Sequence, residues 1–315
     1  MASRLTAVFA CQACGATSPK WLGRCPECGE WNSFVEETRG PAPRTAPSGG
    51  AAAVSIAALD REEKPRLATG LGGLDRVLGG GLVPGSVILL GGEPGIGKST
   101  LLLQAGRGLA GRGRDVLYAS AEESSAQVRL RGGRLGIREE RLLVLAETDV
   151  SRIVAEAESR APAVVVIDSV QAVREPSLAS APGTVSQVRA AAAELVRFAK
   201  SRGVPVLLVG HVTKDGSIAG PKSLEHLVDA VVSIEGDRGS SRRLLRATKN
   251  RFGPVDEIAL YEMTGDGLRE LPDASATLLA ERRPGLAGSA VTAAREGSRS
   301  VLVEIQALVG AAAAG

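Results

Sequence analysis

The segment from Gly92 to Ser99 reads GEPGIGKS and has the GxxxxGK[ST] spacing of a phosphate-binding loop. Glycines at these positions let successive backbone N–H groups turn inward around phosphate oxygens at the start of a helix. Lys98 would reach the β- and γ-phosphates of ATP, and the Ser99 hydroxyl would serve Mg²⁺. The alternative is a plain glycine-rich turn. The expected ATP-binding residues are Gly92, Glu93, Pro94, Gly95, Ile96, Gly97, Lys98, Ser99 and Thr100.

ATP hydrolysis also needs carboxylates near the phosphates. Asp168 closes the apolar run AVVVID, which fits a strand whose last residue holds Mg²⁺. Glu122 and Glu123 follow the run DVLYAS, and one of them would orient the attacking water. We favour Glu122; the alternative is that both are solvated loop carboxylates.

Four cysteines form two CxxC pairs separated by ten residues: Cys11, Cys14, Cys25 and Cys28. Two such pairs can complete a tetrahedral S₄ site for Zn²⁺. Gly15 and Gly29 each follow the second cysteine of a pair, where the chain must turn back. Disulfides are disfavoured in a cytoplasmic protein, and redox chemistry more often uses a single CxxC. We therefore expect structural zinc with no open ligand position.

Strands and helices alternate in the region that must position these residues. Strands are expected at 86–90, 115–120, 142–146, 163–168 and 204–209, with helices at 98–110, 125–135, 150–160 and 185–201. This alternation predicts an α/β fold with a mainly parallel, doubly wound central sheet. Residues 231–262 read as successive strands that extend the sheet, and a further strand is expected at 300–308.

The composition is that of an ordinary globular protein, with 315 residues, 44% hydrophobic and 23% charged. A net charge of +3 does not by itself argue for nucleic-acid binding. No apolar run approaches the roughly 18 residues of a membrane helix, and the N-terminus lacks a secretory pattern. We expect a cytoplasmic protein with no membrane partner. The Pro/Gly/Ala-rich segment 38–66 is expected to be a flexible linker.

Several longer motifs resemble the RadA/Sms family, the bacterial RecA-like ATPases of DNA repair and recombination. KWLGRCPECGEWNSF at 20–34 and the stretch from TGLGG to GKST at 69–100 are typical of that family. The most distinguishing motif is KNRFG at 249–253, supported by HVTKDG at 211–216 and GPKSLEHLVD at 220–229.

The resemblance implies a DNA-dependent ATPase that uses ATP, Mg²⁺ and Zn²⁺ and binds single-stranded DNA and branched recombination intermediates. Such proteins form hexameric rings and promote branch migration alongside the RecA recombinase. The KNRFG residues would couple ATP to DNA and contact the neighbouring subunit's nucleotide: Lys249, Asn250, Arg251, Phe252 and Gly253. Without the resemblance, this motif reads as a basic strand end before a turn.

The resemblance also makes His211, which ends an apolar strand, a candidate γ-phosphate sensor, and Lys214 and Lys222 candidate DNA-channel residues. The alternatives are a structural histidine and a solvated loop. The implied domains are a zinc ribbon at 1–37, the linker at 38–66, a RecA-like domain at 67–272 and, at 273–315, the truncated start of a Lon-protease-like domain.

Two other functions are weighed against the DNA motor. One is an ATP-binding switch or scaffold for RecA and DNA that lacks motor activity because of that truncation. The other is a clock-type protein that phosphorylates itself, which the KNRFG motif and the zinc ribbon disfavour.

Overall fold

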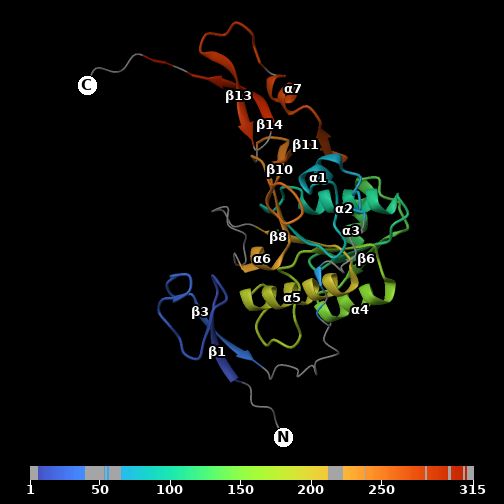
Figure 1. Cartoon of the computed structure of the whole chain (residues 1–315), viewed down its shortest axis with the longest axis vertical. Coiled ribbons are helices and arrows are strands. Elements are labelled where there is room, and N and C mark those ends of the chain that lie inside the picture. The colour runs from blue at the N-terminus through green and yellow to red at the C-terminus, as the bar shows by residue number, and fades with distance from the viewer. Residues whose placement is uncertain are drawn as a thin grey trace, which may run out of the picture.

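The described part of the chain folds into three β-sheets, with helices on both faces of the largest one (Figure 1). The structure, a computed structural model, describes residues 6–39, 53, 55–56, 65–211, 223–237, 239–280, 282–296, 299–307 and 309–310. Over these ranges, no helix has both the length and the apolar character needed to cross a membrane.

A nine-stranded sheet forms the centre of the molecule, in the order β12-β11-β10-β9-β4-β8-β7-β5-β6. Neighbours from β9 to β6 run parallel, which confirms the mainly parallel sheet. Antiparallel neighbours extend it from β9 to β12. The strands are β4 (Val87–Gly92), β5 (Val116–Ser120), β6 (Leu142–Ala146), β7 (Val164–Asp168), β8 (Val206–His211), β9 (Ala230–Glu235), β10 (Arg242–Asn250), β11 (Ile258–Thr264) and β12 (Gly267–Leu271).

Helices cover the two faces of this sheet. One face packs against α1 (Gly72–Val77), α2 (Lys98–Ala110) and α3 (Ser125–Arg134). The other face packs against α4 (Val150–Arg160), α5 (Val185–Arg202) and α6 (Ser223–Leu227).

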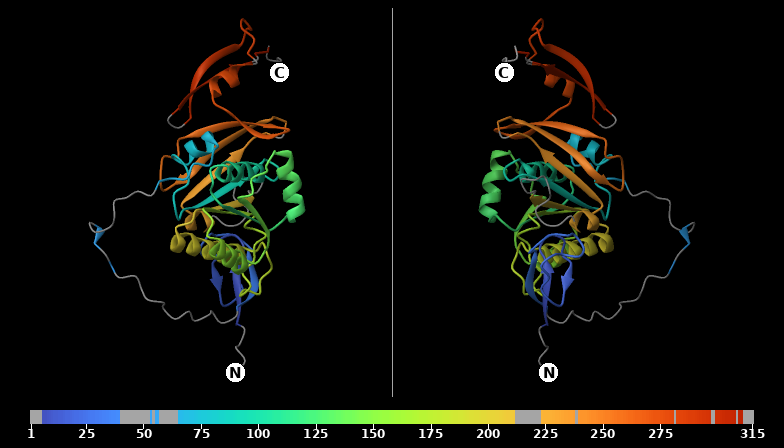
Figure 2. Two further views of the ribbon diagram at one scale, coloured as in Figure 1. Left: turned by 90° about the vertical axis from the view of Figure 1, so that its right-hand side faces the viewer. Right: turned by 90° about the vertical axis from the view of Figure 1, so that its left-hand side faces the viewer.

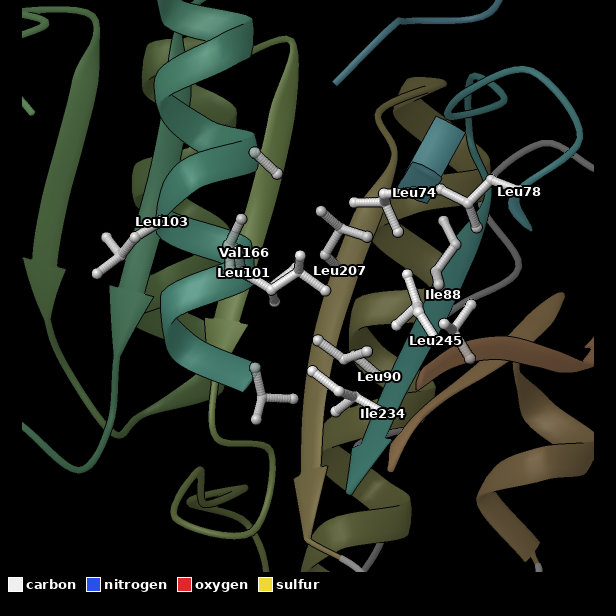
Figure 3. Close-up of a cluster of buried hydrophobic side chains, with 14 of the residues drawn as sticks. Leu74, Leu78, Ile88, Leu90, Leu101, Leu103, Val166, Leu207, Ile234 and Leu245 are labelled. Carbon is white, nitrogen blue, oxygen red and sulfur yellow. The ribbon is translucent and has the colours of Figure 1, made fainter. Parts of the chain in front are cut away.

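Successive residues of the central strands contribute to two different hydrophobic cores, because they point to opposite faces of the sheet. On β4, Ile88 and Leu90 join the core under α2, while Val87 and Leu89 join the core under α5. Figure 3 shows Leu101 of α2 beside Val166 and Leu207 of the sheet. All residues of β4, β5 and β7 are buried, as expected for central parallel strands.

Two smaller units lie at opposite ends of the molecule (Figure 2). At one end, β1 (Thr6–Cys11), β2 (Thr17–Ser18) and β3 (Phe34–Arg39) form the sheet that carries the cysteines. At the other end, α7 (Ala274–Leu279) lies against the hairpin of β13 (Ser289–Glu296) and β14 (Arg299–Gln306).

Candidate functional site

The glycine-rich loop joins β4 to α2 and takes a conformation that its glycines permit. Gly95 and Gly97 have φ of +80° and +116°, in the left-handed region that other residues rarely adopt. Gly92 is needed for a different reason, because a Cβ there would lie 2.7 Å from Ile234 of β9. The loop therefore wraps tightly at the start of α2, where helix N–H groups favour an anion.

Lys98, the first residue of α2, curls back over this loop. Its Nζ donates hydrogen bonds to the carbonyl oxygens of Gly92 at 2.8 Å and Glu93 at 2.9 Å, and the residue is 4% exposed. Burial lowers the pKa of Lys98, while the negative charges of Asp168 and Glu122 raise it. Strands β5 and β7, which Glu122 follows and Asp168 closes, end on the same side of the sheet as β4 and its loop.

Asp168 ends β7 in the position expected for a magnesium carboxylate. In the sheet, β8 lies between β7 and β4, the strand that leads into the phosphate loop. Because the three strands are parallel, the carboxyl ends of β7 and β4 lie on the same side of the sheet. Asp168 is 8% exposed, and its Oδ2 accepts a hydrogen bond from the Tyr118 hydroxyl. Burial, together with the charge of Asp168, raises the pKa of Tyr118 well above its usual value, so the phenol stays a donor.

The structure separates Glu122 from Glu123. The Glu122 carboxylate accepts a hydrogen bond from the hydroxyl of Ser169, the fully buried residue that follows Asp168. The Glu123 carboxylate instead forms an ion pair with Arg131 of α3 at 2.5 Å. Ser124 then caps α3, so the chain turns away immediately after the two glutamates. The contacts favour Glu122 for a role next to Asp168.

Ser99 and Thr100 lie in the first turn of α2 beside Lys98. A Ser99 hydroxyl and an Asp168 carboxylate are oxygen donors of the kind that Mg²⁺ prefers, so these residues fit a nucleotide-bound magnesium ion. His211 ends β8 directly opposite Gly92 in the sheet, which places its backbone beside the loop. The His211 side chain and the residues Lys214 and Lys222 lie outside the described part of the chain.

A cavity of about 180 Å³ opens beside Thr100 that no sequence motif indicated. Its walls come from α2, α3 and the turn between β11 and β12: Thr100, Arg131, Arg134, Leu135, Met263, Thr264, Gly265 and Gly267. A Cβ on Gly97 would lie 2.5 Å from the side chain of Met263, so the end of β11 packs directly against the phosphate loop. Arg243 of β10 also reaches the loop, where its Nε donates to the Ile96 carbonyl at 3.1 Å.

The KNRFG motif lies near the start of β4, at the opposite end of the parallel strands from the phosphate loop. Asn250 pairs with Ala230 of β9, and Ala230 pairs with Ile88 near the start of β4, whereas the phosphate loop follows the end of β4. Lys249 Nζ donates to the carbonyl oxygens of Glu225 at 2.5 Å and Val228 at 2.8 Å, at the end of α6.

Arg251 contacts the carboxylate of Asp229, which is 4% exposed, at 3.3 Å. The same carboxylate accepts bonds from Lys200 Nζ at 2.5 Å and from the Val87 backbone N–H at 2.9 Å. Asn250 Oδ1 accepts from the Phe252 N–H, and Gly253 packs against Gly79. Both cations of the motif are therefore bonded within their own chain and lie away from the ATP site of that chain.

The four cysteines form a compact group with all sulfur atoms within 4.8 Å of one another. Cys11 and Cys28 are 3.7 Å apart, and Cys14 and Cys25 are 3.5 Å apart. A tetrahedral zinc ion with Zn–S bonds of about 2.3 Å needs sulfurs about 3.8 Å apart, so the group fits Zn²⁺.

The two cysteine turns have the same backbone form. Gly15 donates to the Cys11 carbonyl and Gly29 donates to the Cys25 carbonyl, each with φ of +76°, as their place in the sequence predicted. This ribbon contacts the central α/β unit through α5, where Arg189 donates to the Cys14 carbonyl at 3.4 Å.

Comparison with known proteins gives sequence relatives along most of the chain. Residues 70–217 match the AAA domain family, and residues 9–36 match the rubredoxin metal binding domain family. DNA repair protein RadA of Bacillus subtilis is 51% identical over 96% of this chain and 67% of its own length. DNA repair protein RadA of Pseudomonas aeruginosa is 50% identical over 96% of this chain and 68% of its own length. The chain thus spans about two thirds of these relatives.

Solved structures share the fold at lower sequence identity. A KaiC-like protein of Pyrococcus horikoshii matches with a TM-score of 0.55 and 19% identity, over 66% of this chain and 99% of its own. The RadB recombinase matches with a TM-score of 0.52 and 22% identity, over 65% of this chain and 99% of its own. The central domain therefore has a RecA-like fold, preceded by a ribbon with four clustered cysteines.

Proposed function

Because the chain belongs to the RadA family of DNA repair proteins, we propose that it is a recombination ATPase whose turnover is stimulated by single-stranded DNA. The observation that supports the ATPase assignment best is the convergence of Lys98, Asp168 and Glu122 at one edge of the sheet. These side chains come from three separate strand ends, and each has a different task in phosphoryl transfer to water.

The chemistry divides among the residues of the site. Backbone N–H groups of the loop bind the phosphates, and Lys98 stabilises charge on the transferred phosphoryl group. Mg²⁺, when bound with ATP, neutralises phosphate charge, and Ser99 and Asp168 would hold it. Glu122 orients the attacking water and takes its proton, since its carboxylate is held beside Asp168 by Ser169.

We propose that the nucleobase of ATP binds in the cavity beside Thr100. It borders the first turn of α2, and Leu135 and Met263 give it an apolar lining suited to a planar ring. Arg134 supplies positive charge on the same wall, where Arg131 is paired with Glu123. An ATP molecule could thus extend from the loop into this cavity.

The KNRFG motif would act on another molecule rather than on the ATP of its own chain. Lys249 and Arg251 lie near the start of β4, so in a ring of subunits they could meet a neighbour's nucleotide and report bound DNA to it. The proposed DNA substrates are single strands and branched recombination intermediates, processed by branch migration with the RecA recombinase. We place this activity in the cytoplasm.

A second candidate is an ATP-dependent switch or scaffold without motor activity. The observation in its favour is that Lys249 and Arg251 are both bonded within their own chain. In either case zinc would stabilise the fold of the ribbon, because the four thiolates fill every ligand position.

The test is ATP hydrolysis with and without single-stranded DNA over a range of salt, together with the particle mass in the presence of ATP. The motor predicts stimulation that weakens as salt rises, because phosphate contacts release counterions, and a ring-sized particle. Unstimulated, salt-independent turnover would contradict the DNA-dependent function. DNA binding without branch migration would favour the scaffold. Transfer of label from γ-labelled ATP to the protein would instead indicate self-phosphorylation.

A further inference from the structure

The chain has only two tyrosines, Tyr118 and Tyr261, and both are buried, with exposures of 1% and 0%. They lie in different places. Tyr261 is on β11, where its hydroxyl lies against Gly73 of α1. Tyr118 is on β5, and its hydroxyl donates to the carboxylate of Asp168. One tyrosine therefore touches the ATP site and the other does not.

The strand register explains how Tyr118 reaches Asp168. Tyr118 lies opposite Val166 on the neighbouring strand β7, and Asp168 comes two residues after Val166. Residues two apart on a strand share a face, so Tyr118, Val166 and Asp168 point to the same side of the sheet. Tyr118 and Val166 both belong to the core under α2, the helix that begins with Lys98 and Ser99.

A carboxylate that binds a metal ion must be held in a suitable orientation. Side chains that hydrogen-bond to such a carboxylate commonly fix its orientation. Oδ2 of Asp168 accepts a hydrogen bond from the Tyr118 phenol. Since the ring is packed in the core, it cannot swing away as a surface side chain could. The bond therefore holds the Asp168 carboxylate in one orientation at the end of β7.

We propose that Tyr118 is a positioning residue for nucleotide-bound magnesium and acts by orienting the Asp168 carboxylate. The inference rests on the proposed role of Asp168 in holding Mg²⁺. It is separate from the role of Glu122, whose carboxylate has its own hydroxyl partner in Ser169. Tyr118 needs no contact with ATP, and it lies outside both the phosphate loop and the strand that ends in Asp168.

The test uses the 315-residue chain carrying Tyr118→Phe, which removes one hydroxyl and keeps the buried ring. Binding of a fluorescent ATP analogue is measured over a magnesium titration and again in EDTA. We expect the magnesium concentration for half-maximal binding to rise about 10- to 100-fold, the usual effect of removing the partner of a metal ligand. Affinity in EDTA should be unchanged, because the phosphate loop is intact.

Tyr261→Phe is the matched control, since it removes the hydroxyl of the other buried tyrosine. It should leave the magnesium titration unchanged, whatever its effect on melting temperature. A donor-retaining replacement at position 118, p-aminophenylalanine, should restore the wild-type titration. If Tyr118→Phe titrates like the wild type and Tyr261→Phe, or if the amino analogue fails to restore it, the inference is wrong.

Asp168→Asn separates this inference from the proposed function on which it rests. If Asp168→Asn weakens magnesium-dependent binding and Tyr118→Phe does not, only the role of Tyr118 is refuted. If Asp168→Asn leaves the magnesium titration unchanged, the assignment of Asp168 to magnesium fails, and the inference fails with it.

Discussion

The two ends of the parallel strands carry functional candidates of opposite character. At the end that bears the phosphate loop, Lys98 is 4% exposed and lies near two carboxylates that each have a hydroxyl partner. At the other end, the side chain of Arg251 is 56% exposed and makes a 3.3 Å contact with a carboxylate that already has two closer donors. The candidate ATP site is thus organised by its own chain, whereas the KNRFG cations are held in a way that another molecule could change.

This difference indicates that ATP binding needs no second molecule, whereas the proposed coupling of ATP to DNA does. A preorganised set of donors and carboxylates costs little reorganisation when ATP binds, so a single chain can assemble it. Under the proposed function, the two KNRFG cations must by contrast exchange partners within the chain for partners outside it before they couple ATP to DNA. Substitutions at the two ends should therefore affect different measurements.

The largest expected effect is that of Lys98→Ala on basal ATP turnover. A cation on the transferred phosphoryl group is worth roughly 10³- to 10⁵-fold in rate, so turnover should fall by about that factor. Lys249→Met is the matched control, because it removes a lysine from the other end of the strands and should leave basal turnover within a few-fold. Retained turnover in Lys98→Ala would refute the assignment of the ATP site.

The next effect separates the two adjacent glutamates. Glu122→Gln should lower turnover by about 10²- to 10⁴-fold, the range for loss of a general base, while ATP binding persists. Glu123→Gln should change turnover only a few-fold, because Glu123 is paired with Arg131. Single-turnover hydrolysis and nucleotide binding measured on both variants decide between them. The reverse ranking would show that the contacts of these side chains rearrange when ATP binds.

The smallest effect concerns stability at the KNRFG end. Lys249→Met leaves two carbonyl oxygens at the end of α6 without their donor and should cost about 1–3 kcal/mol. Arg251→Met removes an ion pair whose arginine is 56% exposed, and it should cost at most about 1 kcal/mol, because Asp229 keeps Lys200 and the Val87 N–H.

Urea unfolding measures the stability difference, and ATP hydrolysis with single-stranded DNA measures coupling. Both variants should lose stimulation by DNA, although only Lys249→Met is clearly destabilised. Equal loss of stability in the two would mean that the contact of Arg251 with Asp229 is stronger than its exposure indicates. If DNA still stimulates ATP hydrolysis fully in both variants, the KNRFG motif has no role in coupling ATP to DNA.

Much of the local structure followed from the sequence. The helix expected at 98–110 has those bounds in α2, because glycine precedes it in the left-handed conformation and glycine follows it. The strand expected from 204 begins at Val206 instead. Pro205 comes just before it, and proline has no N–H to donate to a neighbouring strand.

Other features could not be found by scanning the chain. The cavity beside Thr100 is built from residues near 100, 131–135 and 263–267, which share no motif. The bond from Tyr118 to Asp168 joins residues 50 positions apart, and it depends on which strands are neighbours. Nothing in the spacing of the two tyrosines distinguishes the one that serves the site.

The sequence by itself determined the phosphate loop and the cysteine turns, because both are formed by consecutive residues whose glycines permit the required backbone angles. Only the tertiary structure decided which glutamate lies beside Asp168, which hydroxyl orients that aspartate, and that KNRFG lies away from the ATP site of its own chain. These relations depend on strand order and register, which are set by the packing of segments far apart in the chain.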